Sequence, residues 1–215
     1  MLNSLSKRRT HKVIGDPANP ENAGQEQNSL MQRLLEAAGN APFHYACDRQ
    51  HQLEMSSPVP WRAYILDTEN CRNLMAELLA SGDTTKIPNM LAATRFLVQV
   101  TWLPDPGTLQ GEPMEKDQPD FEGTQRNMEH IAAASAFIQS LLLAAIDAGF
   151  KTYWSSGGPL RTRKMFRRLC IPENQMLLGS VFLFPDELKN GEIRPGAMVA
   201  ARGGVSDWSR SLQLT

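Results

Sequence analysis

The sequence predicts one domain of the α+β class. The stretch Met128–Ala148, rich in Ala and Leu, has the composition of a long helix. The apolar run Leu177–Phe184 has the length of an interior strand in a sheet that is covered on both faces. With 215 residues, 41% of them hydrophobic, the chain can bury one sizeable core. Because no repeat or second domain is apparent, residues 1–215 are expected to form a single domain.

The first predicted helix covers Leu30–Ala41. Its apolar residues lie on one face at helical spacing, Asn28 or Ser29 can cap its N-terminus, and Pro42 ends it. The following segment, Phe43–Pro60, is long for a connection and rich in polar residues. We therefore expect it to line a site.

The middle of the chain predicts a strand, a helix and a second strand. Arg62–Leu66 has a strand pattern, and Asp67–Asn70 then turns into a helix over Cys71–Ala80. Phe96–Trp102 is the next strand. The segment Leu103–Gly123 contains four prolines and several acids, so we expect an exposed excursion there.

The C-terminal half begins with the long helix Met128–Ala148. Apolar residues cover most of its circumference, so it must be buried by the sheet or by a second subunit. Gly149 stands where a left-handed capping residue is expected. A short strand over Lys151–Trp154, a turn over Ser155–Pro159 and a helix near Arg161–Leu169 follow.

Composition argues against several classes of function. A formal net charge of -1 does not imply a polyanionic partner such as a nucleic acid. The longest apolar stretch, Ile131–Ala148, is interrupted by polar residues and falls short of a membrane span. Met1–Arg9 has three positive charges but no apolar region of a signal peptide. We therefore expect a cytoplasmic protein without a membrane anchor.

The cysteines are expected to be free thiols, because they are odd in number, widely separated and form no CxxC pair. They are Cys47, Cys71 and Cys170. His44, His51 and Glu54 match neither a helical ligand pair nor a common zinc pattern. The sequence therefore predicts no metal site.

Two segments have chemistry that suits a ligand. The basic cluster Arg8–Lys12 (Arg-Arg-Thr-His-Lys) supplies forked donors, charge and a hydroxyl, which suit a phosphate monoester. Its alternative interpretation is a solvated basic N-terminus. In Ser155–Gly158, consecutive small residues let a ligand approach backbone N–H groups, although a plain tight turn has the same composition. No GxSxG, P-loop or GxGxxG motif is present.

Taken together, five segments resemble the FMN-dependent nitroreductase family, and most closely its shorter bacterial members. The basic cluster resembles the family's N-terminal phosphate segment, and Tyr153–Gly157 resembles its W-x-S-G flavin turn. The other three resemble, in order, a helix ending in Ala-Pro, the start of the strand after Pro-Trp, and the central dimer helix. They are Leu35–Pro42, Pro60–Ile65 and Ala132–Gly149.

The resemblance implies a three-layer fold, with a central, mainly antiparallel sheet flanked by helices, and a homodimer formed through the long central helix. It also implies FMN at the subunit interface and hydride transfer from NAD(P)H, through the flavin, to an electron-poor acceptor such as a nitroaromatic or quinone. No acid–base residue of the protein is required, and His44 is a substrate-side candidate. The implied cofactor-binding residues are Arg8, Arg9, Thr10, Lys12, Trp154, Ser155, Ser156, Gly157, Gly158 and Arg202. Of these, the first four and Arg202 would hold the phosphate and polar tail.

Two departures from the family pattern leave alternatives open. Val59 stands where the family usually has Gln, and Tyr45–Val59 is an insertion. The insertion and the excursion Leu103–Gly123 could form a lid for another flavin reaction, such as reductive dehalogenation or flavin fragmentation. The missing Gln is also compatible with a non-catalytic flavin-binding dimer.

Overall fold

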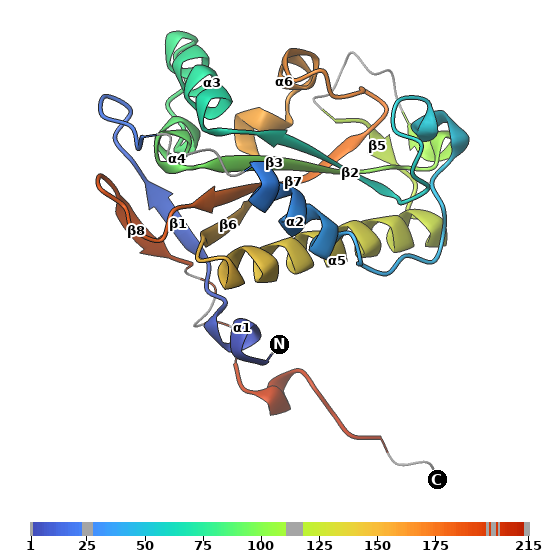
Figure 1. Ribbon diagram of the computed structural model, residues 1–215. Helices are drawn as coiled ribbons and strands as arrows, with labels where there is room; N and C mark the ends of the chain where they lie inside the picture. The colour runs from blue at the N-terminus through green and yellow to red at the C-terminus, as the bar shows by residue number, and fades with distance from the viewer. Residues whose placement is uncertain are drawn as a thin grey trace.

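A four-stranded antiparallel sheet forms the centre of the protein, with strand order β2-β3-β7-β6 (Figure 1). Its strands are β2 (Trp61–Leu66), β3 (Phe96–Trp102), β6 (Lys151–Ser155) and β7 (Met176–Phe184). Each agrees with the sequence prediction to within one residue at either end. β7 lies between β3 and β6 and is buried along nearly its whole length, which confirms the predicted interior strand. The computed structural model describes residues 2–22, 28–110, 118–196, 198, 201 and 203–212.

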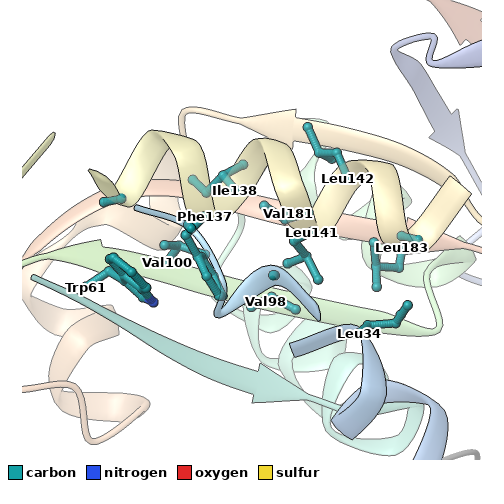
Figure 2. Close-up of a cluster of buried hydrophobic side chains, with 14 of the residues drawn as sticks. Leu34, Trp61, Val98, Val100, Phe137, Ile138, Leu141, Leu142, Val181 and Leu183 are labelled. Carbon is teal, nitrogen blue, oxygen red and sulfur yellow. The ribbon is translucent and has the colours of Figure 1, made fainter. Parts of the chain in front are cut away.

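One face of the sheet is covered by the long helix α5 (Gln125–Asp147) and by α2 (Asn28–Ala38) (Figure 1). Figure 2 shows the apolar core between α5 and the sheet, where Trp61 stacks on Phe137 with ring centroids 5.4 Å apart. Trp61 is therefore a packing residue. Gly149 follows α5 with a φ of +84°, which confirms the predicted left-handed position.

The opposite face is covered by α3 (Thr68–Ala80), α4 (Ile87–Ala93) and α6 (Arg163–Arg168). Because side chains alternate along a strand, β3 sends Val98 and Val100 to the α5 side and Leu97 to the second core. The result is a three-layer arrangement around an antiparallel sheet, as predicted.

By length and hydropathy alone, α5 meets the requirements of a membrane span. A core helix meets the same requirements, and one face of α5 is packed on the sheet. On its outer side, α1 (Leu2–Lys7) lies against the C-terminal end of α5, where Ser4 bonds to Asp147. Packing on the sheet thus confirms one of the two predicted sources of burial for this helix.

Several short elements are not evident from the sequence. They are α1 (Leu2–Lys7), the antiparallel pair β1 (His11–Ile14) and β8 (Glu192–Pro195), α4, and the two-residue strands β4 (Leu109–Gln110) and β5 (Asp120–Phe121). The predicted helix Arg161–Leu169 is instead a 3-10 turn over Gly158–Arg161 followed by α6, which Thr162 caps by accepting from the Met165 N–H. Such short elements depend on tertiary contacts, because a few residues cannot stabilise a helix or hairpin alone.

Candidate functional site

A hollow of about 540 Å³ opens where the N-terminal segment meets α5 and β6. It brings together Arg8 and Thr10 of the basic cluster and Trp154, which directly precedes the second candidate segment and lies about 140 residues further along the sequence. The residues that line it are Leu5, Arg8, Thr10, Gln139, Leu142, Thr152 and Trp154. Leu142, labelled in Figure 2, belongs both to this wall and to the core.

The N-terminal wall of the hollow is held by hydrogen bonds. The Ser4 hydroxyl donates to the Asp147 carboxylate at the end of α5 (2.7 Å), and the Arg8 N–H donates to the Ser4 carbonyl (2.9 Å). Arg8 Nη1 lies 3.4 Å from Thr10 Oγ1. A guanidinium and a hydroxyl therefore stand side by side at the edge of the hollow.

The rest of the basic cluster lies outside the hollow. Arg9 Nη1 donates to the backbone carbonyls of Ser6 and Arg8. Lys12 Nζ lies 5.0 Å from the centre of the Tyr153 ring. Because side chains alternate along β6, Tyr153 faces away from the hollow that its neighbours Thr152 and Trp154 line.

Several basic side chains lie near this region. The pKa of His11 is lowered, first by burial and then by the charges of Lys151, Arg9 and Arg8. Lys151 is paired with Asp186. Arg8 is the charged residue among those that line the hollow, so an anion there would be attracted to its guanidinium.

The inner wall of the hollow comes from β6 and has one unusual polar group. Thr152 is only 1% exposed, and its hydroxyl has no hydrogen-bond partner among the described residues. The Trp154 indole lies across Gly179 of β7, where any Cβ would overlap the indole ring. Gly179 is therefore the residue that allows Trp154 to lie against the sheet.

The turn after β6 is tightly constrained. Gly157 has a φ of +106°, and a Cβ there would lie 2.6 Å from Leu177 Cδ2. The Gly157 N–H donates to Ser155 Oγ (3.2 Å), so this donor is used within the turn. Ser156 and Gly158 are exposed, whereas Ser155 is buried. Glycine is thus required at Gly157 for conformation and for space.

A polar row, buried except for the half-buried Tyr64 and not indicated by the sequence, crosses the sheet beside this turn. Ser155, Ser180, Gln99 and Tyr64 are aligned across the four strands. The Ser180 hydroxyl lies 2.6 Å from Gln99 Oε1. These residues come from four strands that are far apart in the sequence, so no local pattern marks them as a group.

His44 is not part of the hollow. It is exposed, and its neighbour Phe43 packs edge-on against Trp61 with ring centroids 6.0 Å apart. The centre of the Tyr45 ring lies 5.8 Å from Cζ of Arg126, near the start of α5. At 1.5 Å per residue, Arg126 is about 20 Å along the helix from Gln139 in the hollow.

The segment Phe43–Pro60 closes around a buried arginine instead of lining the hollow. Arg62 is 4% exposed, and its terminal nitrogens lie within hydrogen-bonding distance of five backbone carbonyls. A small cavity of about 140 Å³ lies beside it, next to His51, Tyr64 and Gln175. The sequence reasoning did not identify Arg62, because nothing local distinguishes it from an exposed strand arginine.

The remaining sequence predictions have mixed outcomes. Arg202 and the central part of the excursion, 111–117, lie outside the described residues. The cysteines are free thiols, as predicted, and burial raises the pKa of Cys71 to about 12. Within the described part of the chain, no group of three or more His, Cys, Asp or Glu residues is placed to hold a metal ion.

No protein-family model matches this sequence, and no curated protein matches it. Solved structures do match. A nitroreductase-like family protein from Bacillus cereus superposes with a TM-score of 0.58 at 18% identity, covering 95% of each chain. A nitroreductase with bound FMN from Desulfitobacterium hafniense DCB-2 gives 0.56 at 16% identity, covering 99% of this chain and 97% of the other.

A nitroreductase with bound FMN from Bacteroides fragilis gives a TM-score of 0.50 at 17% identity, covering 86% of this chain and 88% of the other. At such identities the similarity establishes the fold alone. The chain has a nitroreductase-like fold, which confirms the fold that the sequence predicted.

Proposed function

We propose that this chain is an FMN-dependent oxidoreductase of the cytoplasm, which moves hydride from NAD(P)H to an electron-poor acceptor such as a nitroaromatic or quinone. One observation carries the proposal: the fold brings Arg8 and Thr10 to the same hollow as Thr152 and Trp154. Solved proteins of this fold include nitroreductases with bound FMN.

The residues of the hollow fit a flavin nucleotide. Its volume of about 540 Å³ lies within the range of about 300–1,000 Å³ typical of cofactor and small-molecule sites. Arg8 supplies a forked cation and Thr10 a hydroxyl, which suit a phosphate. Leu5, Leu142 and Trp154 supply an apolar wall. The unpartnered Thr152 hydroxyl is a further polar group available to a ligand.

Bound FMN would supply the redox chemistry, because its N5 accepts and returns a hydride. The protein's own residues bind and orient. Arg8 and Thr10 would hold the phosphate, and Trp154 would fix the wall that leads toward the turn. Ser156 and Gly158 would offer their N–H groups at that turn, where negative charge on the ring would be stabilised. Gly157 would fix the turn's conformation, because Ser155 already occupies its N–H.

The rest of the proposed site follows the same assignment. Arg9 and Lys12 would contribute positive charge around the phosphate without lining the hollow. Arg202, from the C-terminal segment, would be a further phosphate ligand. The resemblance to the family supports these roles, and so do the positive charges of Lys151, Arg9 and Arg8 around His11.

We further propose a homodimer formed through α5. On the side of this helix that faces away from the sheet, six residues at spacings of three and four form one face. Met128, the first of them, is 57% exposed. The six are Met128, Ala132, Ser135, Gln139, Leu143 and Ile146. Two antiparallel copies of α5 related by a two-fold axis would place the His44 end of one chain beside the hollow of the other. His44 would then reach the substrate side of the partner's cofactor.

The test begins with the absorption spectrum of the purified protein and a titration of FMN and riboflavin. We expect bound flavin with a preference for FMN. Arg8→Ala should reduce FMN affinity by about tenfold or more and narrow the preference over riboflavin, because a hydrogen bond to a charged group contributes about 1.5–3 kcal/mol. Arg167→Ala is the matched control, since Arg167 is exposed on α6 across the sheet. A protein that takes up no FMN would overturn the proposal.

A second experiment separates an enzyme from a flavin-binding protein. Anaerobic NADH or NADPH should bleach the flavin spectrum, and nitroaromatics or quinones should restore it. Bound FMN that neither nucleotide reduces would favour the non-catalytic alternative. Analytical ultracentrifugation of the FMN-loaded protein gives the mass of the particle. A mass equal to that of one chain would exclude the dimer.

A further inference from the structure

The Thr152 hydroxyl is buried near the start of β6 and has no partner among the described residues. Thr152 is 1% exposed, and its Oγ1 finds no acceptor or donor among the described residues. Buried polar groups in folded proteins are nearly always hydrogen-bonded, because an unpaired group retains the cost of losing its water. This group therefore requires an explanation.

The other buried threonines of the sheet region follow the general rule. Thr94 Oγ1 lies 2.9 Å from both the Phe96 and Leu183 carbonyls. Thr101 donates to the Gln175 side chain at 2.6 Å. Thr152 differs from them in lining the hollow. A ligand in the hollow is therefore a candidate for the missing partner.

The position of Thr152 identifies which part of a cofactor it would meet. It shares the hollow with Arg8 and Thr10, the proposed phosphate ligands. Ser155, at the start of the flavin turn, lies three residues further along the strand, which is about 10 Å at 3.3 Å per residue. Thr152 is therefore at the tail end of the site and not at the ring end.

We infer that the Thr152 hydroxyl is a binding residue for the phosphorylated tail of FMN, and that its hydrogen bond is completed only by the cofactor. This inference rests on the proposed function. A threonine hydroxyl can donate to a phosphate oxygen or exchange hydrogen bonds with a tail hydroxyl, so it suits either group of the tail. Thr152 is then a third polar contact beside Arg8 and Thr10.

The decisive variant is Thr152→Val, which keeps the shape of the side chain and replaces the hydroxyl with a methyl group. FMN affinity should fall by about tenfold, as expected for one hydrogen bond to a charged or polar ligand group. The melting temperature of the FMN-free protein should stay equal or rise by about 2–4 °C, because an unpaired buried hydroxyl is lost. A merely structural threonine would show the opposite, with lower stability and unchanged affinity.

Two controls complete the experiment. Thr94→Val removes a hydroxyl that is fully bonded, so it should lower the melting temperature and leave FMN affinity unchanged. Thr152→Ser keeps the hydroxyl and should keep wild-type affinity. Equal FMN affinity in Thr152→Val and wild type would overturn the inference alone, as would an equal loss in Thr152→Ser. A wild-type protein that binds no FMN would overturn the proposed function and this inference together.

Discussion

Replacement of Arg62 by Met should destabilise the protein through the segment that closes around it. The four N–H groups of the two terminal nitrogens are shared among five backbone carbonyls, at distances between 2.7 and 3.0 Å. These carbonyls belong to His51, Met55, Ser57, Val59 and Trp61. Met keeps most of the aliphatic volume, so the loss of hydrogen bonds is isolated from the loss of packing.

The expected magnitude follows from which carbonyls water can reach. Those of Met55, Ser57 and Val59 are in residues that are exposed or half-exposed and can be hydrated, whereas His51 and Trp61 are buried. Two unsatisfied buried carbonyls cost about 1–3 kcal/mol each, or about 2–6 kcal/mol together. The guanidinium itself was desolvated on folding, which offsets part of this cost. We expect a loss of about 2–4 kcal/mol from a total stability of about 5–15 kcal/mol.

The assay is urea unfolding followed by tryptophan fluorescence. Trp61 adjoins Arg62, so its emission reports the same region. Arg167→Met is the control, because this exposed arginine should change stability by no more than about 0.5 kcal/mol. If Arg62→Met unfolds at the wild-type urea midpoint, the carbonyls are satisfied without Arg62 and the reasoning is wrong.

Two further predictions concern the hollow and the pH dependence of stability. Gly179→Ala places a Cβ inside the Trp154 indole, so it should lower the free energy of unfolding by about 1–3 kcal/mol and weaken FMN binding. Gly107 has open space around it, so Gly107→Ala should change neither stability nor FMN binding. An unchanged melting temperature in Gly179→Ala would contradict this prediction. Burial lowers the pKa of His51 in the folded state, so the unfolded chain binds more protons as the pH falls through about 6.5, and stability should decline there. Between a pH above about 6.5 and one below it, the urea midpoint should fall less in His51→Gln than in the wild-type protein. An equal fall in both proteins would exclude His51 as a source of the pH dependence.

The sequence predicted well those elements whose pattern is long and regular. The strand Phe96–Trp102 was evident as a run of strand-forming residues, and the helix over Met128–Ala148 as a long stretch rich in Ala and Leu. The pair β1 and β8 was missed, since a four-residue strand has too few alternations to be distinguished from a loop. Arg62 was missed for another reason. Its carbonyl partners come from a loop with no periodic pattern.

The candidate site shows the same division. The sequence alone determined that Arg8 and Thr10 have the chemistry of an anion site, that Gly157 lies in a tight turn, and that the fold is a helix-flanked sheet. Only the tertiary structure decided that Arg8 and Thr10 share a hollow with Trp154, while Arg9, Lys12 and His44 lie elsewhere. It also revealed the unpartnered hydroxyl of Thr152 and the need for glycine at position 179. Local patterns record which face of an element is buried, whereas contacts between β1 and β6 depend on how strands far apart in the chain are arranged.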